Sequence, residues 1–404
     1  LTRVQRHTFI VSQRNGAVEL PAFLADEPVL IGSGVFQMGV GGLHSKHDKS
    51  VCYVATPDFI IRDADVGAFY PNILLNAGYV PRGLGARFVE IYRGFVNERI
   101  TAKHVAKKLK ELGKSMALTP EQQQKLDECL VLDAGGKIMI NGTFGKLGSC
   151  FSKIYSPDLM LGITLTGQFY LLALIEYLVE IGVKIISANT DGVTFGGTPA
   201  QVEEATKFIE IYGWLSNFEF EFVDYRVIAM KDCNNYIAVK TNGDVKAKGL
   251  YADSGLQKNP TNEVCSKAAA AYLRDGTPIR DFILNHFTIE NFTNFLQVRS
   301  VKGGAAQYTE TKLVDDWFES APGQWVRPGW TKAPVKRKSR PHPIEVGIDP
   351  HFLGRVARWY YSTRPNLSLR YISNGNLVPK SEGGRACMKL PDTLPADVDI
   401  QRYI

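Results

Sequence analysis

Two aspartates that each follow a short apolar strand constrain most strongly what this chain can fold into. Asp65 comes after the apolar run 59–61, and Asp191 lies in the segment 189–192, Asn-Thr-Asp-Gly, between two strand-like stretches. An Asp-Gly pair between apolar stretches is typical of a tight β-hairpin turn. A lone aspartate at a strand end is usually only a turn residue. These two are 126 positions apart, so they can act together only if their strands are neighbours in one sheet.

The composition permits a large folded core and favours a reducing compartment. Hydrophobic residues make up 45% of the 404 residues, a length that predicts two or three domains at roughly 150 residues each. The six cysteines are scattered without a C-x-x-C pair, so neither a zinc site nor a disulfide framework is expected. No stretch reads as a signal peptide or as about 18 uninterrupted apolar residues. We therefore expect a cytoplasmic protein without a membrane partner.

A pair of long helices is predicted in the first half of the chain. Residues 86–113 read as a basic helix. A second helix is predicted to begin after Thr119, because Pro120 suits the first helical position and Gln122 completes a capping box. Two helices joined by so short a loop form an antiparallel hairpin.

Helices and strands continue to alternate up to about residue 255. Residues 158–181 read as one long apolar helix and residues 200–215 as another, while 225–230 and 236–239 read as strands. Beyond that point helical, aromatic and basic stretches mix, and prolines become frequent. The change in character predicts a domain boundary near residue 255.

Three segments resemble sequence motifs of the family B DNA polymerases and occur in that family's order. Residues 65–73 read DVGAFYPNI, similar to motif A, D-x-x-S-L-Y-P-S-I. Residues 137–145 read KIMINGTFG, similar to motif B, K-x-x-x-N-S-x-Y-G, and residues 188–192 read ANTDG, similar to motif C, Y-G-D-T-D-S. The wording of residues 41–45, GGLHS, and of 141–149, NGTFGKLGS, is most similar to bacteriophage members. One such motif arises easily by chance, whereas three in order do not.

The resemblance implies an α+β fold, the right-hand polymerase, with an antiparallel-sheet palm, a two-helix fingers hairpin and a mainly helical thumb. It assigns residues 1–85 to an N-terminal segment and the first part of the palm, and residues 86–148 to the fingers. Residues 149–254 form the second part of the palm and residues 255–404 the thumb. The likeness covers residues 34–250 well and the remainder thinly.

The family's chemistry assigns the two aspartates to metal binding. Addition of a nucleotide to a primer 3′ end uses two divalent cations, and Mg²⁺ prefers a few carboxylates together with phosphate oxygens. The resemblance therefore implies that Asp65 and Asp191, with the backbone carbonyl of Val66, hold two Mg²⁺ ions, for which Mn²⁺ can substitute. Both aspartates are then the catalytic residues.

The residues implied in nucleotide binding come mainly from the two predicted helices. Arg99 and Lys103 are four positions apart and so share one helix face. Lys137 and Asn141 have the same spacing on the next helix, and in the family such residues hold the triphosphate. The resemblance makes Tyr70 a steric gate beneath the sugar, which excludes the 2′-hydroxyl of a ribonucleotide.

Other segments resemble those that hold primer–template DNA. They are a glycine motif ahead of the palm and two lysine-containing segments after motif C, 231–236 and 246–249. Glycine allows a backbone to approach a phosphate closely. The residues implied in DNA binding are Gly41, Gly42, Lys231, Tyr236 and Lys248. The residues expected to support the metal ligands without binding the metals are Asp63, Asn189 and Thr190.

The chain departs from the family pattern at several positions. Asn189 replaces the first aspartate of motif C, and Ala68, Asn72 and Phe144 replace two serines and a tyrosine. Asparagine keeps the shape and an acceptor oxygen of aspartate without its charge, so we expect Asn189 to orient the turn. The D-x-E signature of a proofreading exonuclease, which most relatives carry ahead of the palm, does not occur upstream of residue 34. We expect no proofreading by this chain. Either a separate exonuclease subunit or a removed domain remains open, and the expected partners include a separate exonuclease or processivity subunit.

Three functions remain open at this point. The first is a template-directed DNA polymerase that uses primer–template DNA and deoxynucleotides, and that replicates phage DNA in the host cytoplasm. The second is a primase-like or RNA-synthesising polymerase on the same palm, against which Tyr70 argues. The third is a non-catalytic DNA-binding module derived from a polymerase. The joint presence of both aspartates with Lys137 and Arg99 argues against that third function.

Positive charge is concentrated in two places, on a chain whose net charge is +6. Residues 93–114 carry seven basic and two acidic side chains, and residues 332–340 carry five basic ones. Such clusters bind phosphates or simply form a solvated surface. Residues 355–361 interleave basic and aromatic side chains, which suits either a helix packed on a core or a nucleic-acid surface.

Overall fold

The computed structural model describes residues 24, 26–81, 83–255, 259–308, 310–327, 334–348 and 350–404. The chain divides into two compact units between residues 246 and 247, whereas the sequence predicted a boundary between 254 and 255. Residues 1–23 of the predicted N-terminal segment lie outside the described residues, and so does Lys332 of the second basic cluster.

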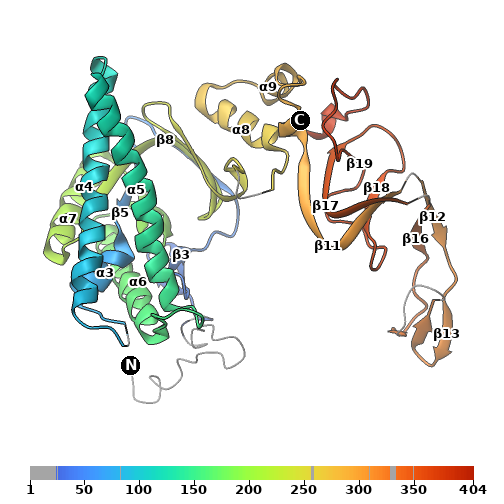
Figure 1. The fold of residues 1–404 in the computed structure, drawn as a ribbon, viewed down its shortest axis with the longest axis horizontal. Helices are drawn as coiled ribbons and strands as arrows, with labels where there is room; N and C mark the ends of the chain where they lie inside the picture. The colour runs from blue at the N-terminus through green and yellow to red at the C-terminus, as the bar shows by residue number, and fades with distance from the viewer. Residues whose placement is uncertain are drawn as a thin grey trace. The chain divides into compact units, whose positions relative to one another are not determined.

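A ten-stranded antiparallel sheet forms the centre of the first unit (Figure 1). Its order is β1-β2-β3-β6-β7-β5-β8-β9-β10, and β4 pairs with β8. The strands are β1 (Val29–Ile31), β2 (Gly34–Met38), β3 (Leu43–Ser45), β4 (Val51–Val54), β5 (Ile60–Val66), β6 (Lys184–Asn189), β7 (Gly192–Gly197), β8 (Phe220–Asp232), β9 (Asn235–Lys240) and β10 (Val245–Ala247). Mixed α and β structure with antiparallel sheets agrees with the predicted fold class.

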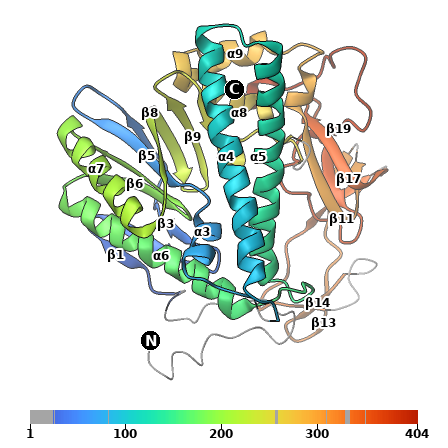
Figure 2. The same cartoon turned by 60° about the vertical axis from the view of Figure 1, so that its left-hand side comes forward.

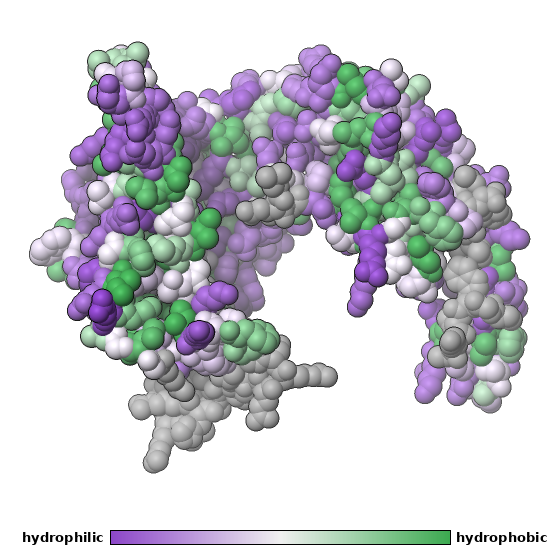
Figure 3. Space-filling model, in the orientation of Figure 1, coloured by the Kyte–Doolittle hydropathy of each residue, from purple (hydrophilic) through white to green (hydrophobic). Residues whose placement is uncertain are grey.

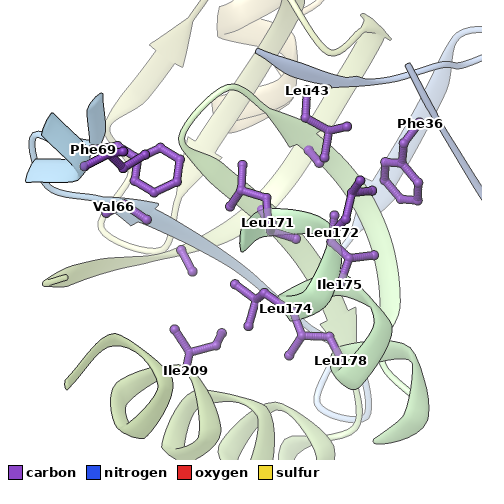
Figure 4. Packing of buried hydrophobic residues seen from close by; sticks show 14 of the residues in the cluster. Phe36, Leu43, Val66, Phe69, Leu171, Leu172, Leu174, Ile175, Leu178 and Ile209 are labelled. Carbon is purple, nitrogen blue, oxygen red and sulfur yellow. The ribbon is translucent and has the colours of Figure 1, made fainter. Parts of the chain in front are cut away.

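Two helices cover one face of this sheet, α6 (Pro157–Glu180) and α7 (Pro199–Ser216) (Figure 2). The predicted long apolar helix is α6. Its apolar side chains belong to the core, where Leu171, Leu174 and Leu178 are fully buried. Figure 4 shows these leucines within the cluster of apolar side chains that also includes residues of α7 and of the strands. By length and composition α6 is the one described helix that would suffice to cross a membrane, but half of its most apolar stretch is buried inside the protein.

The predicted helix pair is α4 (Arg87–Ser115) and α5 (Pro120–Leu147), which lie side by side (Figure 1). The predicted capping box is confirmed, since Thr119 Oγ1 accepts from the Gln122 amide at 3.2 Å and Gln122 Oε1 accepts from the Thr119 amide at 2.9 Å. Figure 3 shows hydrophilic side chains gathered over the outer half of the hairpin. The buried contacts between the helices are small or aliphatic, Ala102, Ala106, Leu126 and Cys129.

The second unit is built mainly of strands, so the prediction of a mainly helical thumb is wrong. The unit contains α8 (Glu263–Asp275) and α9 (Ile279–Asn285), but a four-stranded sheet in the order β18-β11-β17-β19 follows them. Its strands are β11 (Gln297–Tyr308), β17 (His351–Tyr361), β18 (Ser368–Tyr371) and β19 (Gly384–Ala386).

Strand β17 shows why the local sequence was misleading. Leu353, Ala357 and Trp359 are buried and lie on one face, as alternate positions of a strand do. Gly354, Arg355, Val356 and Arg358 lie between them, and the consecutive burial of Trp359, Tyr360 and Tyr361 hides the two-residue period. The strand is fixed by β11, in which Gln297 lies opposite Trp359. The partner strand lies 62 positions away in the sequence, so the pattern of residues within β17 does not reveal it. The preference of a segment for strand structure depends on such cross-strand partners.

The chain between β11 and β17 forms a separate excursion built of strands (Figure 1). Its described residues between 310 and 348 are hereafter the arm. The arm consists of a ribbon of β12 (Glu310–Val314) with β16 (Ile344–Ile348), and a sheet of β13 (Phe318–Ala321), β14 (Gln324–Val326) and β15 (Val335–Lys336).

The packing of α6 predicts a large cost for truncating Leu174. Leu174 is fully buried in the main apolar cluster, so Leu174→Ala removes apolar contacts and leaves a cavity. We expect a loss of about 2–5 kcal/mol in the free energy of unfolding, measured by urea denaturation. Leu215→Ala on α7 is the control, because Leu215 is 69% exposed and its truncation should change stability by less than about 0.5 kcal/mol. Equal effects of the two changes would contradict the assignment of α6 as the core helix.

Candidate active site

The sheet register brings the two aspartates together. Asp65, near the end of β5, lies opposite Gly192, the residue after Asp191, in the neighbouring strand β7. The Val66 amide donates to the Asp191 carbonyl at 2.8 Å. The segment 189–192 is the turn of the β6–β7 hairpin, with Asn189 paired to Gly192. A strand end and a hairpin turn thus form one acidic corner of the sheet.

Gly192 makes room for the Asp65 carboxylate. A Cβ atom at position 192 would lie 2.0 Å from Asp65 Oδ1 and 3.1 Å from the Ala64 carbonyl oxygen, which no side chain tolerates. Thr190 has a φ of 56°, the left-handed conformation that completes this tight turn. The Asp-Gly sequence therefore serves the turn and also leaves one carboxylate oxygen of Asp65 unobstructed by β7.

A pocket of about 410 Å³ opens at this corner. It is lined by residues of the β5 end, the β6–β7 turn, β8, both helices of the hairpin and the short helix α3 (Phe69–Asn76). Nine of the residues singled out in the sequence line it: Asp65, Val66, Tyr70, Arg99, Lys103, Lys137, Asn141, Thr190 and Asp191. Acidic groups come from the strands and the turn, and cationic groups come from the helices.

Two of the cations in the pocket are already paired with acids. Arg99 Nε donates to Asp133 Oδ1 at 3.0 Å, which joins α4 to α5. Lys103 Nζ forms a short ion pair with Glu221 of β8. Among the described residues Lys137 has no ion-pair partner. The pocket therefore offers one uncompensated ammonium and two cations whose partners an anion would have to displace.

Tyr70 is held rigidly at the edge of the pocket. Its hydroxyl donates to the Gly41 carbonyl at 2.7 Å, and its ring lies 4.8 Å from that of Phe144 on α5. Gly42 has a φ of 150°, and a Cβ there would lie 2.7 Å from the Tyr70 hydroxyl. The glycine pair predicted to bind DNA thus also fixes Tyr70. Burial and the charge of Asp191 raise the pKa of this phenol well above its ordinary value, so it stays neutral.

Asp63 stands beneath the site and supports it. Its carboxylate is buried and accepts from Thr194 Oγ1 at 2.6 Å and from the Tyr225 hydroxyl at 2.7 Å. Lys246 Nζ lies 3.1 Å from Asp63 Oδ2 and 3.6 Å from Asp65 Oδ2. Asp63 is not among the residues that line the pocket.

The acidic corner changes the protonation of Asp65. Burial is the main cause that raises the pKa of the Asp65 carboxyl to about 6. The neighbouring carboxylates of Asp63 and Asp191 add to the rise, and Lys246 opposes it. A nearby cation stabilises the ionised form of a carboxyl whose pKa is raised in this way, and so lowers that pKa.

Asn189 is not among the residues that line the pocket, and its side chain holds the turn. Its Nδ2 donates to the Cys233 carbonyl and to Asn234 Oδ1, both at 3.0 Å, and its Oδ1 accepts from Thr190 Oγ1 at 3.0 Å. These bonds tie the β6–β7 turn to the turn between β8 and β9. The residue that breaks the family pattern thus has a structural use that needs an amide.

The remaining residues predicted to bind DNA lie outside the pocket. Lys231 is an exposed residue of β8, and the ring of Tyr236, on β9, lies 6.0 Å from Lys246 Nζ. Lys248 belongs to the second unit. Sequence reasoning missed Glu221 and Asp133 as partners of the cations, and it did not foresee the contact of Lys246 with Asp65. The only sequence signal for Glu221 is weak: it is an acidic residue in a strand, and the structure places it opposite Asp65.

The acidic corner fits a site for Mg²⁺ shared with a substrate. Asp65 and Asp191 supply two carboxylates and Val66 a carbonyl, and Gly192 leaves the Asp65 oxygen accessible. Within the described ranges no group of three or more His, Cys, Asp and Glu side chains is placed to hold a metal by itself. Mg²⁺ is commonly bound by one or two carboxylates completed by substrate phosphates and water, and this donor set matches that pattern.

The chain has sequence relatives among archaeal DNA polymerases. It is 26% identical over 145 residues to DNA polymerase 1 of Sulfurisphaera ohwakuensis, a match that covers 35% of this chain and 16% of that protein. It is 26% identical over 166 residues to DNA polymerase 1 of Sulfolobus acidocaldarius, which covers 40% of this chain and 18% of that protein. The matched segments thus span less than a fifth of either relative. No protein-family model matches the chain.

These relatives, with the three ordered motifs, make the chain a relative of the DNA polymerases. Within that class, the three ordered motifs resemble those of family B. Among solved structures, the family B DNA polymerase from the archaeon Pyrobaculum calidifontis matches with a TM-score of 0.42 and 15% identity. That match covers 89% of this chain and 46% of that chain.

The contact between Gly192 and Asp65 predicts that Gly192→Ala disrupts the site. The added methyl group would force the carboxylate away, and a displacement of about 1 Å at a reacting centre costs about 100-fold in rate. For the primer extension proposed in the next subsection, we expect a loss on that scale without loss of the fold, measured by extension kinetics and circular dichroism. The control is Gly94→Ala, since a Cβ at Gly94 meets nothing within 4 Å. An active Gly192→Ala variant would show that Asp65 does not need its observed position.

Proposed function

We propose that the chain is a template-directed DNA polymerase that adds deoxynucleotides to a primer 3′ end. The observation that supports this most is the pocket in which Asp65 and Asp191 share the space with cations of two helices. Carboxylates suit metal ions that bridge phosphates, and lysine and arginine suit the phosphates themselves. A nucleoside triphosphate with its metal ions would bind between them, with the metal ions at the carboxylates and the phosphates at the lysine and arginine side chains.

The metal ions of this reaction would be two Mg²⁺, held by Asp65, Asp191 and the Val66 carbonyl together with phosphate oxygens. When bound, they would activate the attacking 3′-oxygen and neutralise charge on the leaving pyrophosphate. The protein's own part is to fix the carboxylates. The β5–β7 register and the hydrogen bonds of Asn189 do this before any ligand arrives.

The helices would bind the triphosphate. Lys137 is free to form a charge-assisted hydrogen bond at once, whereas Lys103 would exchange Glu221 for a phosphate oxygen. Arg99 can retain Asp133 through Nε and still present its other guanidinium nitrogens, because arginine has five N–H donors. Asn141 adds an uncharged donor from the same helix as Lys137. The arrangement discriminates a triphosphate from a monophosphate by the number of cations engaged.

We further propose a role in replicating phage DNA, from the wording of residues 41–45 and 141–149. In this proposal proofreading and processivity come from other polypeptides or from other parts of a longer protein. The site in the cell would be the host cytoplasm, where primer–template DNA and deoxynucleotides are present.

The proposed chemistry predicts that both aspartates are required for primer extension. Asp65→Ala and Asp191→Asn remove negative charge from the metal site and should lower the extension rate in Mg²⁺ by a factor on the order of 10²–10³ or more, the scale for losing one stabilising group. Binding of primer–template DNA should change little. Asp244→Asn, in the turn after β9 and away from the pocket, should behave like the parent. Normal extension by either site variant would defeat the proposed mechanism.

The rigid seat of Tyr70 predicts its role in sugar selection. A ring fixed by Gly41 and Phe144 cannot move aside for a 2′-hydroxyl. Tyr70→Ala should therefore raise the use of ribonucleotides relative to deoxynucleotides by at least about tenfold, in competition assays. Tyr70→Phe keeps the ring and should keep most of the discrimination. If both variants select sugars as the parent does, the gate lies at another residue and the role proposed for Tyr70 is wrong.

A further inference from the structure

The arm of the second unit carries a dense exposed cluster of cations. Lys336, Arg337, Lys338 and Arg340 are all exposed and lie within five consecutive positions. None of them is near the pocket residues in sequence, and the resemblance to polymerases is thin in this part of the chain. The cluster therefore needs an explanation of its own.

The cluster is fixed to a folded support. Lys336 ends β15 and pairs with Gln324 of β14, and the Arg337 amide donates to the Gly323 carbonyl at 3.0 Å. Arg340 Nη2 donates to Asp315 Oδ1 at 3.2 Å. A backbone fixed on a sheet edge lowers the entropy lost when these residues bind a ligand.

Three acids of the arm have partners other than Lys336, Arg337 and Lys338. Asp315 pairs with Arg340, Asp316 pairs with the buried Arg327, and Glu319 Oε1 accepts from the Gly323 amide at 2.6 Å. In the part of the chain that the structure describes, Lys336, Arg337 and Lys338 form no ion pair. Three adjacent cations without a partner repel one another, and an external polyanion relieves that repulsion.

The surroundings favour a nucleic acid over a protein partner. Protein interfaces are depleted of lysine, whereas phosphate backbones are bound chiefly by lysine and arginine. Phe318, at the start of β13, is 51% exposed on the same small sheet. An exposed aromatic ring on the sheet that also carries the cations suits contact with sugars or bases.

We propose that the arm binds the phosphate backbone of DNA through Lys336, Arg337 and Lys338. The inference rests on the proposed function in naming DNA as the ligand, but it concerns a surface outside the pocket and outside the residues implied by the family motifs. The arm adds affinity that does not depend on sequence, because its contacts are to phosphates. Its contribution falls as salt concentration rises, since binding releases counterions.

The test compares two triple variants of the full chain. K336Q/R337Q/K338Q removes three cations that have no acid partner. K125Q/K207Q/R274Q removes three exposed cations that are already paired, with Glu128 at 3.6 Å, Glu203 at 3.3 Å and Asp275 at 2.7 Å. Both variants carry the same formal charge. Thermal unfolding of each variant verifies the fold before binding is compared.

Binding of a fluorescein-labelled primer–template duplex is measured by anisotropy from about 50 to 200 mM salt. For the arm variant we expect weaker binding, and a salt slope of log K that is smaller by about 2–3, at about 0.9 per lost phosphate contact. The control variant should keep the parent slope. An arm variant with the parent's affinity and slope overturns the inference, and so does a loss shared equally by the control.

Two further outcomes are distinguishable. The binding measurement needs no nucleotide and no catalysis, so an arm effect in a chain that fails to extend primers preserves this inference while defeating the proposed function. Normal extension with unaltered DNA binding by the arm variant defeats this inference alone. If the arm cations are needed for binding to phosphatidylserine vesicles and not for binding to the duplex, the ligand is a membrane surface and the inference is wrong.

Discussion

The pairing of β5 with its two neighbours is the constraint on which the rest of the site depends. β5 lies between β7 and β8, and a slip of one residue would turn the Asp65 side chain to the opposite face of the sheet. The register is held by side chains as well as by the ladder. Arg62 forms a two-point ion pair with Asp224 of β8, at 2.6 and 2.8 Å. The buried Asp63 accepts from β7 on one side and from β8 on the other.

Charge is balanced within the first unit by placing opposite signs on different elements. Strands and turns carry the acids, and α4 and α5 carry the cations. Several of these charges have a partner of opposite sign: Lys246 compensates Asp63 and Asp65, and Glu221 compensates Lys103. A buried charge without such a partner would cost several kcal/mol. These ion pairs leave the pocket close to neutral until a charged ligand replaces one of the partners.

Local chemistry made much of the first unit predictable from the sequence. The capping box at Thr119, the Asp-Gly turn at residue 191 and the apolar helix α6 each depend on residues close together in the chain. The contacts of Lys246 with Asp65 and of Lys103 with Glu221 were not predictable, because they join positions more than 100 residues apart and carry no motif. The second unit was misjudged for a related reason. Strand β17 is defined by its pairing with β11, and its own sequence suits a helix almost as well.

The hydrogen bonds of the Asn189 side chain limit which residues can replace it. Its amide nitrogen donates to two acceptors, the Cys233 carbonyl and Asn234 Oδ1, and a carboxylate cannot donate to either. An acid at position 189 would place acceptor against acceptor unless the facing turn also changed. The two turns therefore depend on each other chemically, because the acceptors at residues 233–234 require a donor at position 189. Related chains with an aspartate at position 189 should carry a different β8–β9 turn, one that offers a donor where this chain offers oxygen.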